Sequence, residues 1–269
     1  MRLNYSFPNV KQYKNLRVAV ENKDNRLKIQ VSGPKAFFLQ YFFKYYFKVY
    51  NSMDPVAVHD GSYIYTLYVP PIPSEAHARH FEDFIRRWMF RTRIPLAATI
   101  SVTNRCQYSC PHCSVPAGRD SEPELSLEEL KRIVAECLDL GMTNITFTGG
   151  EPLLFAGLEE LLRSIPREKA VALVFTNAKD LSAEKARSLK EAGAWGIQIS
   201  LDSPVPAEHD KLRMPGSFEC VEEGVKAARE AGLLVGLSTY ATNEFVKKKQ
   251  ADRYRRVGRC LGSAGDQCI

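Results

Sequence analysis

Three cysteines crowd into one short segment, at Cys106, Cys110 and Cys113. The chain has seven cysteines, an odd number, and this spacing suits a metal better than a disulfide framework. Thiolates are the usual protein ligands of iron-sulfur clusters, and a cubane cluster has four iron corners. Three cysteines therefore leave one iron open, as catalytic zinc keeps an open position for a reacting molecule. The segment predicts an iron-sulfur cluster with one iron available for a substrate or cofactor.

A structural zinc ion is the competing interpretation of the same segment. His112 would supply the fourth ligand beside the three cysteines, and the ligand types are those that zinc takes. His112 and Cys113 are adjacent, so a contorted loop would be needed to bring both onto one ion. The spacing favours iron-sulfur over zinc but leaves both open.

From about Leu96 onward, β-branched runs alternate with amphipathic helical segments, a pattern typical of repeated βα units and a parallel sheet. A helix is expected to begin at Ser126, whose hydroxyl can cap a first turn that carries glutamates. The repeats predict an α/β fold with a partial or complete TIM-like barrel, and an open doubly wound sheet is the alternative. Strands are expected over 97–103, 144–148, 171–176, 196–201 and 234–240.

Residues that could do chemistry follow these strands directly, which is where barrel enzymes place their sites. The cysteine segment follows the first strand, and Gly149-Gly150-Glu151-Pro152 follows the second. Thr176-Asn177 ends the third strand, and Ser200-Leu201-Asp202 ends the fourth. We expect all four groups to meet at one edge of the sheet.

Three domains are predicted: an aromatic-rich α/β appendage over 1–93, a core with an incomplete barrel over 94–246, and a basic, irregular tail over 247–269. The aromatic run 37–50 either packs as core or docks on a membrane, a hydrophobic substrate or a partner protein. Val56–Val69 alternates around Asp60-Gly61 as a hairpin would, and an arginine-rich helix is expected over Ser74–Phe90. Cys260 and Cys268 lie in the tail, where a second metal site stays open.

Two motifs in the expected order give the chain a family resemblance. Thr103-Asn104-Arg105 with the three cysteines, and Thr148-Gly149-Gly150-Glu151-Pro152 after the next strand, resemble the radical S-adenosylmethionine (radical SAM) superfamily over roughly 96–240. Ser200-Leu201-Asp202 and His209–Arg213 are similar to the branch with the molybdenum-cofactor cyclase, peptide-modifying and sulfatase-maturing enzymes. The sequence differs from that branch at Ala178, where relatives often have glycine, and in a tail without a recognisable further strand or cysteine-rich extension.

The resemblance implies a role for each group of residues. The three cysteines would hold a 4Fe-4S cluster, whose fourth iron binds the amino and carboxylate groups of S-adenosylmethionine. The backbone of Gly149-Gly150-Glu151 would pair with the methionine amino group, and Glu151 would accept from it directly. The remaining cofactor-binding candidates are Ser200 and Arg213 for the methionine carboxylate or ribose, Asp202 in the same strand-end segment as Ser200, Thr176 and Asn177 at the same face, and His112 beside the adenine.

The implied activity is reductive cleavage of S-adenosylmethionine to a 5′-deoxyadenosyl radical that takes hydrogen from a peptide, cofactor precursor or lipid, with ferredoxin or flavodoxin as reductant. No catalytic residue beyond the cluster site is expected. The alternatives are an inactive or truncated remnant with a scaffold role and a zinc-stabilised nucleic-acid-binding module. The net charge of +6 permits an anionic partner, but basic residues are spread along the chain and no nucleic acid is expected. With no secretory signal at its start and no spanning stretch, the chain is expected in the cytoplasm.

Overall fold

The structure is a computed structural model that describes residues 1–7, 15–24, 26–33, 36–113, 124–241 and 243. Its contacts group into two compact units. The first comprises residues 1–97 with 136–144 and 166–171, and the second comprises residues 98–135, 145–165 and 172–269. The predicted tail 247–269, with Cys260 and Cys268, lies outside the described residues.

The first unit contains an antiparallel three-stranded sheet in the order β1-β2-β3, which was not predicted from the sequence. Charged residues begin β1, β2 and β3, and β2 also ends on a charged residue. A hairpin, β4-β5, turns at Asp60 and Gly61, which both have positive φ, as the Asp-Gly pair predicts. The bounds are β1 Arg2–Ser6, β2 Arg17–Lys23, β3 Arg26–Ser32, α1 Ala36–Asn51, β4 Ala57–His59, β5 Ser62–Ile64 and α2 Glu75–Phe90.

The aromatic run forms α1. The side chains on the inward half of this helix belong to the hydrophobic core of the first unit. Phe43 and Phe47 are fully buried and pack against Phe81 of α2, with ring centroids 5.2 Å apart in each case. Tyr5 of β1 joins the same cluster. These partners belong to the first unit itself, so the appendage has a hydrophobic core of its own. α2 begins at Ser74, whose hydroxyl accepts a hydrogen bond from the His77 amide.

The second unit is built on a five-stranded sheet in the order β10-β9-β8-β7-β6, and all five strands were predicted from the sequence. The strand order is sequential, and β8, β9 and β10 pair in parallel. The bounds are β6 Ala97–Thr103, α3 Leu127–Asp139, β7 Asn144–Gly149, η2 Pro152–Leu154, α4 Leu158–Arg163, β8 Val171–Thr176, α5 Ala183–Ala192, β9 Gly196–Ser200, α6 Pro206–Leu212, α7 Ser217–Glu230 and β10 Leu234–Ser238.

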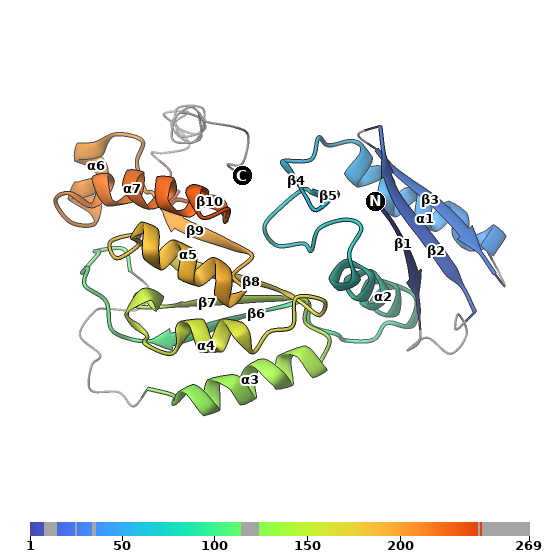
Figure 1. The fold of residues 1–269 in the computed structure, drawn as a ribbon, viewed down its shortest axis with the longest axis horizontal. Helices are drawn as coiled ribbons and strands as arrows, with labels where there is room; N and C mark the ends of the chain where they lie inside the picture. Colours follow the sequence, from blue (N-terminus) through green and yellow to red (C-terminus); the bar gives the residue numbers. More distant parts are fainter. Residues whose placement is uncertain (8–14, 25, 34–35, 114–123, 242, 244–269) are drawn as a thin grey trace. The chain divides into compact units, whose positions relative to one another are not determined.

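This order decides between the two architectures left open by the sequence. Right-handed crossovers between sequential strands place every helix on one face, whereas a doubly wound sheet requires the strand order to reverse. α4 packs on α5 and α5 on α7, and these helices lie side by side in Figure 1. The described sheet has β6 and β10 as its edges, so the arrangement is a partial barrel.

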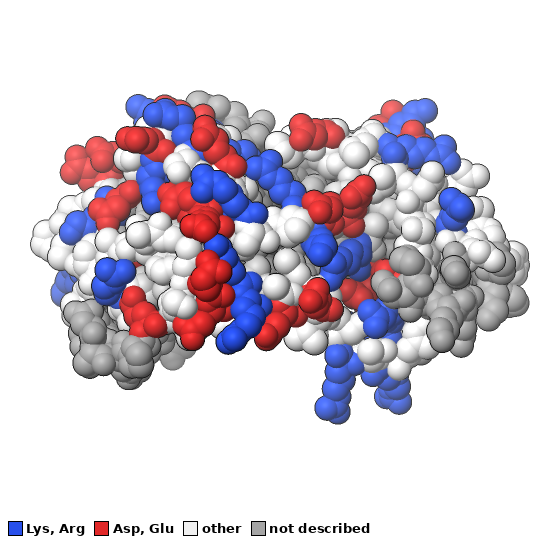
Figure 2. Space-filling view, turned by 60° about the horizontal axis from the view of Figure 1, so that its bottom comes forward, with Lys and Arg blue, Asp and Glu red and all other residues white. Residues whose placement is uncertain are grey.

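Two further features bear on partners. On the face drawn in Figure 2, basic and acidic side chains are interspersed over most of the surface. Within the part of the chain that the structure describes, no helix is long and apolar enough to cross a membrane.

Candidate cluster and cofactor site

A pocket at the carboxyl ends of the strands collects the predicted residues. It is lined by the three cysteines, His112, Gly149, Gly150, Glu151, Thr176, Asn177, Ser200 and Arg213, together with Tyr108, Thr148 and Phe175. Of the twelve predicted site residues, Asp202 alone is absent from this lining. The strand-end rule therefore located the pocket, and it could also have pointed to Thr148 and Phe175.

The cysteine loop is bound to the end of β7 through the backbone. The Gly150 amide donates to the Thr103 carbonyl and the Glu151 amide to the Arg105 carbonyl, both over 2.8 Å. A side chain at Gly150 would overlap the Arg105 carbonyl group. The glycine is thus needed for close approach of the cysteine loop. A methionine amino group needs hydrogen-bond acceptors. Within the backbone of this segment, only the carbonyl oxygens could accept a hydrogen bond from it.

Glu151 is buried, with 1% of its surface exposed, and its carboxylate is used by the protein. It accepts hydrogen bonds from the Leu153 amide at 3.1 Å, the Thr176 hydroxyl at 2.7 Å and the Asn177 amide at 2.8 Å. Burial raises the pKa of Glu151 to about 7, against the opposite effect of these donors. In the structure Glu151 joins the ends of β7 and β8. Its direct contact with a methionine amino group, which the family resemblance implies, stays a prediction.

Asp202 is the centre of a second group of contacts beside the pocket. Its carboxylate lies 2.7 Å from Arg213 Nε and 3.1 Å from His112 Nε2, and it accepts from the Tyr240 amide at 3.1 Å. Burial acts to raise the pKa of Asp202, but the hydrogen bond and charge of Arg213 outweigh it and lower that pKa. Asp202 therefore orients Arg213 and His112, and it is not among the residues that line the pocket, so its part in cofactor binding stays a prediction.

Two histidines contact Asp202, His112 at its carboxylate and His209 at its backbone amide. His209 is fully buried and its Nδ1 accepts from the Asp202 amide at 3.1 Å. The His112 ring stacks on Tyr240 with centroids 4.9 Å apart. Tyr240 lies just after β10, so the strand-end rule could have indicated it.

The thiol of Cys106 has hydrogen-bond donors around it. Burial raises the pKa of the Cys106 and Cys110 thiols, the direction that favours the protonated form. Cys106 Sγ accepts from the Asn177 side-chain amide at 3.9 Å and from the Tyr108 amide at 3.5 Å. Hydrogen bonds to cluster sulfurs are one way in which proteins tune iron-sulfur centres.

The cysteine side chains are not arranged around a single ion. Among the described residues, no group of three histidine, cysteine, aspartate or glutamate side chains is placed to hold one metal ion. A cubane cluster takes each thiolate on a different iron, so its ligands need not converge on one point. With Arg213 in the same pocket as a donor for a carboxylate, the residues fit a cluster that binds a charged organic cofactor.

A family model described as the Radical SAM superfamily matches residues 100–247, more than half of the chain. The chain belongs to the radical SAM superfamily. Enzymes of this superfamily use a 4Fe-4S cluster and S-adenosylmethionine, which agrees with the cofactors expected from the cysteine loop.

Curated radical SAM relatives match about half of this chain. A probable GTP 3′,8-cyclase of Methanocella arvoryzae is 38% identical over 138 residues, which are 50% of this chain and 43% of that protein. An AdoMet-dependent heme synthase of Oleidesulfovibrio alaskensis is 32% identical over 145 residues, 53% of this chain and 37% of that protein. The matched region thus spans less than half of each relative.

The fold is also that of solved radical SAM structures. Streptococcus suis SuiB bound to S-adenosylmethionine aligns with a TM-score of 0.53 and 18% identity, and covers 67% of this chain and 41% of SuiB. At this identity the likeness concerns the fold alone.

Proposed function

We propose that residues 94–246 form the core of a radical SAM enzyme that cleaves S-adenosylmethionine reductively and passes a radical to a bound substrate. The observation that carries this proposal is the pocket that three cysteines share with Arg213 and Ser200 at the strand ends. Cluster and cofactor together would supply a 5′-deoxyadenosyl radical, the oxidant for hydrogen abstraction. The protein's part is to hold and orient the cluster, the cofactor and the substrate, and to exclude water from them.

Each residue has a proposed role in that task. Cys106, Cys110 and Cys113 ligate the cluster, and Arg213 binds the methionine carboxylate through its terminal nitrogens while Asp202 holds its Nε. Ser200 lies beside it in the same lining. The stacked rings of His112 and Tyr240 offer a flat apolar surface to the adenine.

Backbone carbonyls at Gly149 and Gly150 receive the methionine amino group. Hydrogen bonds from Thr176 and Asn177 to the Glu151 carboxylate hold this part of the pocket in place. No general base is required from the chain, because hydrogen atom abstraction moves proton and electron together.

The substrate class is the open part of the proposal. The sequence allows a peptide, a cofactor precursor or a lipid, and the curated relatives are named as a GTP cyclase and a heme synthase. These names favour a small cofactor precursor, and GTP is the first compound to test. A ferredoxin or flavodoxin would provide the electron.

The test is a single-turnover assay for 5′-deoxyadenosine after anaerobic reconstitution with iron and sulfide. Wild-type chain should form it with dithionite and S-adenosylmethionine, and Cys106→Ala should not. Cys137→Ala is the matched control, because that cysteine is buried on α3 and should not affect turnover. A chain that binds the cluster yet forms no deoxyadenosine would support the inactive remnant with a scaffold role.

A further inference from the structure

The outward face of α1 carries large apolar side chains in the open. Phe37 is 85% exposed, Tyr41 82%, Tyr45 67% and Val49 53%. They recur every fourth residue, so they form one stripe along the helix. Single exposed apolar residues are ordinary, but a contiguous aromatic stripe marks an interaction surface.

The charged residues of α1 have one sign. α1 contains no acidic residue, and its two lysines, Lys44 and Lys48, are both exposed. They lie three residues beyond Tyr41 and Tyr45, on the same side of the helix. The α1 surface is therefore aromatic and cationic together.

Trp88 extends the aromatic surface onto α2. Its ring stacks on Phe42 of α1 with centroids 4.5 Å apart and an interplanar angle of 27°. Trp88 is 62% exposed, so this stack presents a large apolar area to solvent. Phe42 sits at the border between the exposed stripe and the buried half of α1, which makes the two surfaces continuous.

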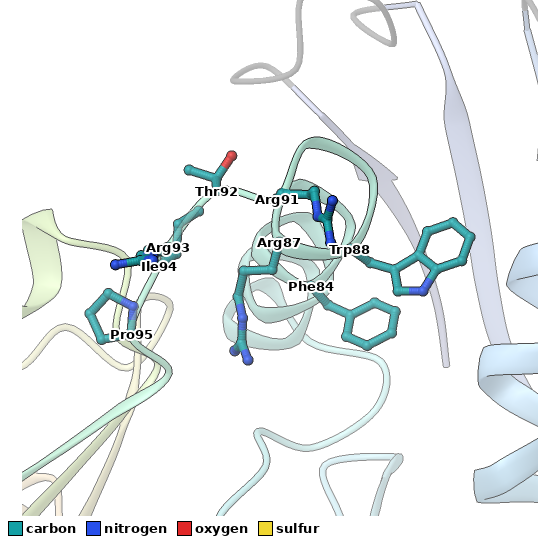
Figure 3. Close-up of a pocket in the computed structure, with 8 residues that line it drawn as sticks. All are labelled: Phe84, Arg87, Trp88, Arg91, Thr92, Arg93, Ile94 and Pro95. Atoms are coloured by element: carbon teal, nitrogen blue, oxygen red, sulfur yellow. The ribbon is translucent and has the colours of Figure 1, made fainter.

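Beyond Trp88 a cavity of about 670 Å³ is lined by arginines. Figure 3 shows its lining residues on the end of α2 and on the segment 92–95, with Arg91 near Trp88, Arg87 extending from the helix and Arg93 on the other side beside Ile94. The neighbouring acids of α2, Glu82 and Asp83, are both buried, and Asp83 pairs with Arg86 at 2.9 Å. This cavity lies in the first unit and shares no lining residue with the cysteine pocket.

We propose that this aromatic-basic face, formed by Phe37, Tyr41, Lys44, Tyr45, Lys48, Val49, Trp88, Arg87, Arg91 and Arg93, docks on the surface of an anionic lipid bilayer. Aromatic rings of an amphipathic helix settle at the level of the headgroups, and cations beside them attract anionic lipid. Guanidinium groups bind phosphate oxygens in pairs, so the arginine cavity is the place for a headgroup. The binding is peripheral, and it is independent of the chemistry proposed for the cysteine pocket.

The experiment is flotation of the full chain with vesicles of phosphatidylcholine alone or mixed with phosphatidylglycerol. Wild type should float with the anionic vesicles and not with the neutral ones. Lys44→Glu with Lys48→Glu should weaken binding about 30-fold or more, since each basic residue contributes a factor of about five. Lys23→Glu with Arg26→Glu, exposed on the β2-β3 hairpin, changes the net charge equally and should leave binding unchanged.

The aromatic contribution is tested by Tyr41→Ser with Tyr45→Ser, against Val58→Ser as a control that is 54% exposed in the same unit. Far-ultraviolet circular dichroism reports whether each variant folds, and the two pairs of variants act on different side chains. Equal binding of the wild-type chain to neutral and anionic vesicles would overturn the proposal. An equal loss of binding in the hairpin variant and in the Lys44 and Lys48 variant would overturn it as well. So would binding to single-stranded RNA without binding to vesicles, since cations with exposed aromatic rings also suit nucleic acid.

Discussion

Asp202 is the residue on which several side chains beside the cysteine loop depend. Its side chain is 1% exposed, and it holds Arg213, whose side chain is 13% exposed. Asp202→Asn should lower the free energy of unfolding by about 3 kcal/mol, because it leaves a largely buried guanidinium without its counter-charge. Urea denaturation of the apoprotein measures this. Glu160→Gln, which breaks a surface pair with Lys131, should cost much less, and equal losses would contradict the assignment.

Glu151 gives a second prediction for a single residue. Its carboxylate accepts three hydrogen bonds, whereas a glutamine offers one acceptor oxygen and an amide that faces other donors. Glu151→Gln should therefore destabilise the apoprotein by about 1 to 3 kcal/mol in urea. Glu159→Gln, which removes a carboxylate that pairs with Lys185 at 2.6 Å, is the comparison on α4. If Glu151→Gln were neutral, Glu151 would not be the brace between β7 and β8.

Residue types and spacing predicted which side chains gather, but not what each one touches. The cysteines and the residues after β7, β8 and β9 could be located because strand ends meet at one edge. The roles of Glu151 and Asp202 could not, because both act through hydrogen bonds to groups distant in sequence, such as Thr176 and Tyr240. No spacing rule records such contacts.

Among the elements, the junction between β7 and the cysteine loop is the one on which cluster binding depends. A Cβ at Gly150 would force the loop away from β7, so Gly150→Ala should lower the iron bound per chain after reconstitution. Gly216→Ala is the control: nothing lies within 4 Å of its added Cβ, although its positive φ makes alanine strained. Gly216→Ala should keep its iron, and similar iron contents in the two variants would argue against the junction.

α2 should make the stability of the first unit sensitive to acid. Burial, and then the charge of Arg87, lowers the pKa of His80 to about 4, while burial also lowers the pKa of His77. Below about pH 6.5 the unfolded chain takes up protons that the folded chain does not, so stability is lost as the pH falls towards 4.

His80→Gln keeps a side chain that can hydrogen-bond to Thr143. It removes one of the imidazoles that take up a proton when the chain unfolds. The variant should thus lose less stability than wild type between about pH 6.5 and pH 4, measured by urea unfolding at each pH. Parallel pH profiles of the two chains would contradict the explanation.

Elements of the second unit could be predicted because strands rich in β-branched and apolar residues alternate with amphipathic helices. The strands β1, β2 and β3 were not predicted, because β1 has only five residues and charged residues interrupt the apolar pattern of β2 and β3. Whether the aromatic run was core or surface could not be decided from composition. It is both, since Phe43 and Phe47 face inward and Tyr41 and Tyr45 outward.

At the scale of the whole molecule, the open edges of the parallel sheet limit stability. Of the described residues, none extends the sheet beyond β10 or β6. Unpaired edges invite association, so the chain alone should melt low in the usual range of about 45 to 65 °C and self-associate as its concentration rises. Calorimetry and light scattering measure the two effects. A cooperative, concentration-independent transition of a monomer at high temperature would contradict this.

The central claim is a cluster whose open iron takes S-adenosylmethionine. Its most direct test is the electron paramagnetic resonance spectrum of the reduced, anaerobically reconstituted chain, recorded with and without S-adenosylmethionine. The account predicts a 4Fe-4S signal that changes when the cofactor is added, and a weaker change in Arg213→Gln at the same cofactor concentration. Stoichiometric zinc in place of iron, or a cluster signal that the cofactor leaves unchanged, would contradict it.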